Sequence, residues 1–113
     1  MEPTIYTNDI VLCEHVTKSI MRGDIVIACS TNDPTVNVCK RVLAIAGDII
    51  HMGGREMMIP TGYIWLQGDN LYNSTDSRNY GPIPLGLVRG RVLAKVWPLS
   101  KFTLFDKNPN LKP

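Results

Sequence analysis

Lys40 is the residue whose type and setting most directly suggest chemistry. It lies in an apolar segment, between Val38 and Val42. A lysine at such a position either extends its amine to solvent or is kept uncharged for use as a base. On the residues alone the first explanation is favoured, because most lysines in strands lie at edges or on the surface.

The segment Gly68–Pro84, GDNLYNSTDSRNYGPIP, is the second candidate. It is dense in hydrogen-bonding side chains, and Asp76 and Arg78 are spaced to form a local ion pair that would stiffen it. A surface loop built from Asx and Ser/Thr turns would have a similar composition. Both interpretations, a surface loop and a site, stay open on the residues alone.

Other chemistries have weaker support. His15 and His51 have no partner pattern typical of a Ser-His-Asp triad, and the acidic residues are too dispersed to form a carboxylate pair. Cys13, Cys29 and Cys39 lack C-x-x-C spacing, which argues against a metal site. We expect the cysteines to be small buried apolar residues, although a disulfide between two of them stays open.

The composition is that of one globular domain. The chain has 113 residues, of which 44% are hydrophobic and 19% charged. Its net charge of +2 is too weak to indicate nucleic-acid binding, and its few aromatic residues do not alternate with basic ones. No apolar stretch approaches the ~18 residues of a membrane-spanning helix.

Alternation of apolar residues predicts a mainly β domain of short, mostly antiparallel strands with long loops. Strands are predicted over 24–29, 36–50, 63–66 and 88–97, with a turn or bulge at Gly47-Asp48. Loops are predicted over 30–35, 52–62 and 69–86, with a frayed tail after residue 100. The face predicted to carry Lys40 also holds Val36, Val38, Val42 and Ala44. The opposite face is predicted to hold Asn37, Cys39, Arg41, Leu43 and Ile45.

Four segments, in this order, together resemble the type I signal peptidase family: residues 1–4 (MEPT), 22–26 (RGDIV), 39–48 (CKRVLAIAGD) and 68–78 (GDNLYNSTDSR). The resemblance implies a single signal-peptidase or LexA-like catalytic β domain over residues 1–100. The short interval between the last two segments leaves no room for the large extra β domain of many bacterial members. Within the family, GDN, DSR and GPIP are most similar to the mitochondrial inner membrane peptidase branch, and to its subunit 1 rather than subunit 2.

The resemblance implies a Ser/Lys dyad mechanism in which Lys40 matches the general base. An ordinary lysine is protonated at pH 7, so apolar neighbours must disfavour its charged form. The family's first motif reads Ser-Met-x-Pro-Thr, and Met1 occupies the substrate-binding position after the nucleophilic serine. We therefore expect the serine, the residues before it that help form the oxyanion hole, and the membrane anchor to be missing from these 113 residues, and the polypeptide alone to be inactive.

The family also implies supporting roles. Ser74 matches the residue that orients the lysine amine, whereas Asp69 matches the partner of Arg41 and Asp76 that of Arg78. These ion pairs would hold the polar loop against the lysine strand. Because a carboxylate beside the amine would favour its charged form, we expect Asp69 and Asp76 to point away from it.

The activity implied is a serine endopeptidase of the mitochondrial inner membrane, facing the intermembrane space. It would remove sorting presequences from its protein substrates, as a heterodimer with a second peptidase subunit and without a cofactor. One alternative is a catalytically inactive subunit that only binds the partner or a presequence. Another is a self-cleaving repressor domain, which the loop sequence disfavours.

Overall fold

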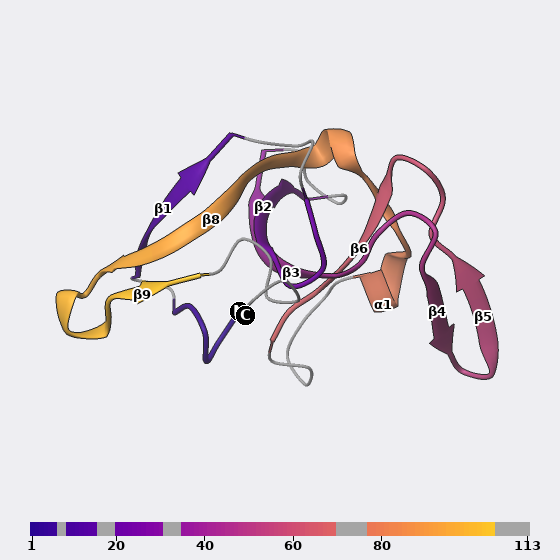
Figure 1. The fold of residues 1–113 in the computed structure, drawn as a ribbon, viewed down its shortest axis with the longest axis horizontal. Helices are drawn as coiled ribbons and strands as arrows, with labels where there is room; N and C mark the ends of the chain where they lie inside the picture. The colour runs from indigo at the N-terminus through magenta and orange to yellow at the C-terminus, as the bar shows by residue number, and fades with distance from the viewer. Residues whose placement is uncertain (7–8, 16–19, 31–34, 70–76, 106–113) are drawn as a thin grey trace, which may run out of the picture.

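The computed structural model describes residues 1–6, 9–15, 20–30, 35–69 and 77–105. Figure 1 shows a chain made of strands, with helical structure confined to single turns. The strands are β1 (Ile10–Glu14), β2 (Ile25–Cys29), β3 (Asn37–Ala44), β4 (Ile49–Met52), β5 (Arg55–Met58), β6 (Tyr63–Gln67), β7 (Ile83–Pro84), β8 (Val88–Trp97) and β9 (Thr103–Leu104). The helical turns are α1 (Ser77–Tyr80), η1 (Leu85–Leu87) and η2 (Leu99–Lys101).

The main sheet has the strand order β1-β8-β2-β3-β6-β7, with β9 also paired to β8, and its neighbouring strands are antiparallel. In Figure 1 the long strand β8 has β1 and β9 along one end, while β2 and β3 curl together at the centre. The strands β4 and β5 form a separate two-stranded hairpin that projects from the opposite side. The predicted mainly antiparallel β fold is confirmed.

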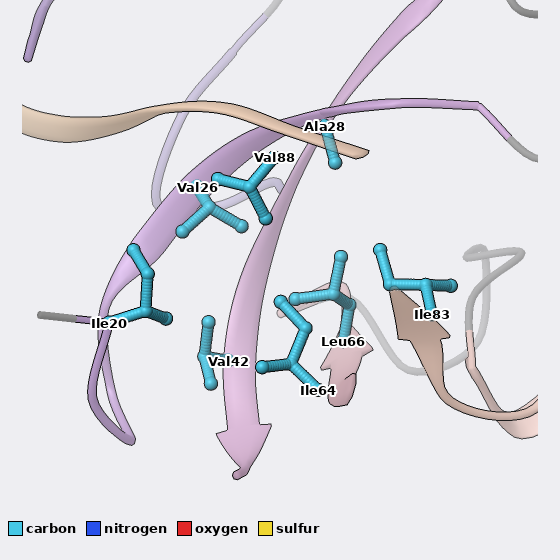
Figure 2. Packing of buried hydrophobic residues seen from close by; sticks show 8 residues of the cluster. All are labelled: Ile20, Val26, Ala28, Val42, Ile64, Leu66, Ile83 and Val88. Carbon is cyan, nitrogen blue, oxygen red and sulfur yellow. The ribbon is translucent and has the colours of Figure 1, made fainter. Parts of the chain in front are cut away.

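The core lies inside the curled sheet and draws on five of its strands (Figure 2). Val26 of β2 and Val88 of β8 meet there, and Ile64, Leu66 and Ile83 gather below them. Along β6, Ile64 and Leu66 face this core, whereas Trp65 between them belongs to a second cluster, so buried side chains lie on both sides of the strand. The β3 strand, which carries Lys40, pairs with β2 along one edge and with β6 along the other.

The face of β3 that carries Lys40 was predicted correctly only in part. Val38 and Val42 pack against the main core, but Ala44 belongs to a second cluster, with Trp65 and Ile59. The register shifts between Val42 and Ala44, and Ala44 pairs with Trp65 of β6. Paired residues lie on the same face of a sheet, so this bulge turns Ala44 away from the face of Val42.

The predicted strands over 24–29, 63–66 and 88–97 are confirmed, and a turn at Gly47, where φ is +90°, separates β3 from β4. The predicted loop over 52–62 is wrong, because β5 folds back onto β4 through Gly53-Gly54. The range 69–86 contains α1 and β7. The expectation of a frayed tail after residue 100 is wrong for Thr103–Leu104, which pair with β8. Residues 106–113 lie outside the described residues, so for them it stays a prediction.

Two cations inside β8 hold β1 and the segment before it. Arg91 donates to Glu14 and to Asp24, and Lys95 forms an ion pair with Asp9 at 3.2 Å.

None of the helical segments within the described ranges has the length and apolar character needed to cross a membrane.

Candidate active site

A cleft of about 520 Å³ opens where the N-terminal turn meets β1, β2 and β3. Met1 and Lys40, far apart in the sequence, both line it. The other lining residues are Glu2, Ile5, Tyr6, Asp9, Val11, Ile27, Val38 and Cys39. The cleft therefore combines apolar residues of the strands with residues of the N-terminal turn, and Lys40 contributes to its wall.

Lys40 is half-buried in β3. It pairs with Val26 of β2, which is completely buried, and Val38 and Val42 precede and follow it on the same face. The predicted apolar neighbours of Lys40 are confirmed. Ser74, the residue predicted to orient the amine, lies outside the described residues.

Arg41 and Asp69 form the ion pair that the sequence predicted. Arg41 Nε and Nη2 donate to the two carboxylate oxygens of Asp69, at 2.9 and 3.0 Å, and its Nη1 donates to the carbonyl oxygen of Gly23 at 2.9 Å. Burial disfavours the charged form of Asp69. The hydrogen bonds from Arg41 and Thr4 nevertheless outweigh that effect and hold the pKa of Asp69 below its usual value.

Thr4 is a part of this arrangement that the sequence interpretation missed. Its hydroxyl donates a hydrogen bond to Asp69 Oδ2, and its backbone N–H donates to the carbonyl oxygen of Met1 at 2.8 Å. Thr4 belongs to the quoted MEPT segment, but its partner lies 65 residues away, so no local pattern could identify it. The hydrogen bond of Thr4 therefore joins the N-terminal turn to Asp69, whose ion-pair partner Arg41 directly follows Lys40 in β3.

The remaining predicted residues lie in or beside the polar loop. Asp76 is outside the described residues, so its predicted pairing with Arg78 and its direction relative to Lys40 stay predictions. Ser77, which follows, is completely buried, and its Oγ accepts a hydrogen bond from the backbone N–H of Leu66 at 2.9 Å. This bond fixes the start of α1 to β6, which is a structural role.

The three cysteines are free, so the disulfide left open by the sequence is absent. The expectation of burial is right for Cys29 and wrong for Cys13, which is exposed. Cys39 is half-buried and lines the cleft. Burial raises the pKa of the Cys39 thiol to about 11, so at neutral pH it is a thiol rather than a nucleophilic thiolate.

Asp9 and Lys95 form a second ion pair at the cleft that the sequence interpretation missed. Both side chains are 8% exposed, and Asp9 also accepts a hydrogen bond from the backbone N–H of Tyr6 at 2.8 Å. That hydrogen bond, followed by the Lys95 ammonium, holds the pKa of Asp9 below its usual value. In the sequence, the signal was Lys95, which lies between apolar residues in the predicted strand 88–97.

Comparison with known proteins extends over almost the whole chain. The sequence profile of the family "Signal peptidase, peptidase S26" matches residues 1–59 and 53–97. "Mitochondrial inner membrane protease subunit 1" of Mus musculus is 50% identical, over 97% of this chain and 72% of its own length. "Mitochondrial inner membrane protease subunit 2" of Danio rerio is 38% identical, over 83% of this chain and 52% of its own length.

A solved structure shows the same fold. A signal peptidase I from Enterococcus faecalis superposes with a TM-score of 0.55 at 19% identity, covering 64% of this chain and 95% of its own. The predicted similarity to subunit 1 above subunit 2 is confirmed by the identities. On the profile match and on the identity to relatives over most of their length, this chain belongs to the signal peptidase family of peptidases, S26.

Proposed function

We propose that this chain forms the catalytic domain of a serine endopeptidase that removes sorting presequences at the mitochondrial inner membrane, with Lys40 as the general base. The observation that carries the proposal is that Met1 and Lys40 line one cleft. In the family motif the nucleophilic serine directly precedes the position of Met1. A residue bonded to Met1 would therefore enter the cleft on the wall that Lys40 also lines.

The mechanism we infer is the Ser/Lys dyad mechanism that the family resemblance implies. It requires the uncharged form of the Lys40 amine, which removes the proton of the serine hydroxyl while the oxygen attacks the carbonyl carbon of the scissile peptide bond. Lys40 then gives that proton to the leaving amine as the peptide bond breaks, which leaves an acyl-enzyme ester. Lys40 next deprotonates a water molecule, whose attack releases the acid and returns the proton to the serine.

The walls of the cleft suit an extended peptide with small side chains near the cut. Val11, Ile27 and Val38 supply apolar surface, whereas Glu2 and Asp9 supply the acidic groups. A peptide bound in extended form gains its affinity from backbone contacts and its specificity from alternate side chains in pockets. We infer sorting presequences as the substrate class from the resemblance to the mitochondrial inner membrane peptidase branch of the family.

The setting of the reaction is inferred from the same relatives. They are named as subunits 1 and 2 of the mitochondrial protease, and this chain is similar to both. We infer a complex with a second peptidase subunit of the same fold, attached to the inner membrane and facing the intermembrane space.

The test compares three polypeptides on a fluorogenic presequence peptide. The first has the 113 residues alone, the second adds an upstream segment that ends in the serine of the family motif, and the third carries Ala in place of that serine. We expect cleavage by the second only, because the other two lack a hydroxyl at the nucleophile position. Peptide binding without cleavage by the second polypeptide would indicate a binding subunit instead. Lys40-dependent cleavage by the first would refute the assignment of the nucleophile.

A further inference from the structure

We infer that Thr4 is a positioning residue: its hydroxyl, acting through Asp69 and Arg41, holds the N-terminal turn at a fixed place against the strand that carries Lys40. The inference rests on the proposed function, since it concerns the geometry of the two groups that would react. It adds a residue to which the motif comparison gave no role.

The contacts form a chain of bonds from Lys40 to Met1. Lys40 is covalently joined to Arg41, Arg41 holds Asp69 through two hydrogen bonds, and Asp69 accepts the hydroxyl of Thr4. Thr4 in turn donates its backbone N–H to the carbonyl oxygen of Met1, 2.8 Å away. Met1 and Lys40 line the same cleft, so both ends of this chain of bonds lie at the site.

Each contact in this chain of bonds restricts the position of the next side chain. The guanidinium of Arg41 is a planar fork, and its third nitrogen is bonded to the carbonyl oxygen of Gly23, so it cannot swing away from Asp69 without losing another bond. The side chains of Arg41 and Asp69 are 28% and 18% exposed, which shields the pair from competing water. Thr4 therefore donates to an acceptor that is charged and already fixed in place.

This restraint matters because attack requires the hydroxyl and the amine to be held in a narrow range of distance and angle. A displacement of about 1 Å at a reacting group can reduce the rate about 100-fold. The contact lies between Thr4 and Asp69, and Asp69 is not among the residues that line the cleft. Loss of the hydroxyl should therefore lower kcat.

The experiment uses the serine-extended polypeptide with Thr4→Val, Thr4→Ser and, as a matched control, Thr61→Val in an exposed loop. Val keeps the shape of Thr but cannot donate. We expect Thr4→Val to lower kcat by about 10–100-fold. Thr4→Ser should restore most of the rate, and Thr61→Val should have no effect. A Thr4→Val enzyme with unchanged kcat, or a Thr4→Ser enzyme as slow as Thr4→Val, overturns the inference.

A second variant separates this route from a general loss of packing. If Thr4 acts through Asp69, then Thr4→Val should change kcat little in an Asp69→Asn background, where the charged acceptor is already gone. Full additivity of the two effects overturns the inference.

A readout without catalysis keeps the inference testable if the proposed function fails. In the 113-residue polypeptide, NMR titration of the Asp69 side-chain carboxyl should show a higher pKa in Thr4→Val than in the unaltered chain, because one hydrogen bond to the charged form is lost. An unchanged Asp69 titration refutes the bond itself. An inactive serine-extended enzyme with a shifted titration refutes the proposed function alone.

Discussion

The guanidinium of Arg91 lies 3.2 Å from the carboxylate of Asp24, and the two side chains are 1% and 0% exposed. Asp24 Oδ2 accepts hydrogen bonds from Arg91 Nη1 and from the backbone N–H of Met21. Asp24 Oδ1 has no hydrogen-bond partner among the described residues. The charge of Asp24 is therefore balanced by Arg91, which links β8 to the turn before β2. That turn also holds Gly23, whose carbonyl receives Arg41.

We predict that Arg91→Met destabilises the fold severely, because it leaves the completely buried carboxylate of Asp24 without its ion-pair partner. An uncompensated buried charge costs about 3–5 kcal/mol. Glu14→Gln, which removes the charge of the half-buried second partner while Arg91 keeps Asp24, should cost less. Urea unfolding followed by circular dichroism measures both, and a loss for Arg91→Met no larger than that for Glu14→Gln would contradict the ion pair of Asp24 with Arg91.

Gly90→Ala should disrupt the pairing of β1 with β8. A Cβ at position 90 would stand 2.9 Å from the carbonyl oxygen of Glu14, so one of the two strands must shift. Overpacking of this kind costs about 1–3 kcal/mol. Gly86→Ala is the matched control, because nothing lies within 4 Å of its added Cβ. Amide hydrogen exchange should speed up in β1 for the first variant only; protection in β1 equal to that of the unaltered chain would refute the close approach.

Substitution of Lys40 by Met should abolish cleavage in the serine-extended polypeptide and leave the fold intact. Loss of a general base costs about 10²–10⁴-fold in rate, and a half-buried apolar replacement suits the face of Val38 and Val42. Ser74→Ala should reduce the rate by a smaller factor if Ser74 orients the amine. Arg55→Met, on the β4–β5 hairpin, is the control for loss of a cation. Residual cleavage by Lys40→Met at more than a tenth of the original rate would remove Lys40 from the mechanism.

The stabilising effect of Asp69 should depend on pH in a defined direction. Its pKa is lowered from an ordinary 3.8, so its ion pair contributes fully above that value and is lost as the pH falls through the lower folded-state pKa. Asp69→Asn should therefore be less stable than the unaltered chain at pH 7 and at pH 5. The difference should shrink below pH 4. A difference that persists unchanged at pH 2 would show that the charge on Asp69 is not its source.

Cys39 should react slowly with iodoacetamide at pH 8. With a pKa of about 11, about one thiol in a thousand is ionised there, and the alkylation rate should rise about tenfold per pH unit up to pH 10. A Cys13→Ser, Cys29→Ser background makes mass spectrometry specific for Cys39. Because Cys39 lines the cleft, a bound presequence peptide should slow the reaction further. Fast alkylation at pH 7 would show that the thiol is not buried as described.

The strands with strong alternation could be located from the sequence. The bounds of β8, Val88–Trp97, were predicted because the apolar run is long and ends at Pro98. The strand β5 was missed because Arg55-Glu56-Met57-Met58 has no β-branched residue, and all four residues are exposed. The Gly53-Gly54 pair did carry a hairpin signal, which the loop interpretation ignored.

The candidate site was predictable where the motif fixes residues and unpredictable where contacts join distant segments. The pairing of Arg41 with Asp69 followed from the motif and is present at 2.9 Å. The bond from Thr4 to Asp69 and the ion pair of Lys95 with Asp9 depend on which surfaces the sheet brings together. The position of Ala44 was missed because a bulge reverses the alternation of side chains, and bulges leave no reliable mark in a single sequence.

The hairpin of β4 and β5 joins the described part of the fold near its base, where Ile50 packs against the cluster of Ala44, Ile59 and Trp65. There Ile59 is buried, and its backbone pairs with Gly47 and Asp48. None of the residues that line the cleft comes from its two strands. The turn at Gly53-Gly54, at the tip of this hairpin, could therefore accept an inserted epitope, a fluorophore or a longer hairpin. Such an insertion would leave the cleft lined by Met1 and Lys40 unchanged.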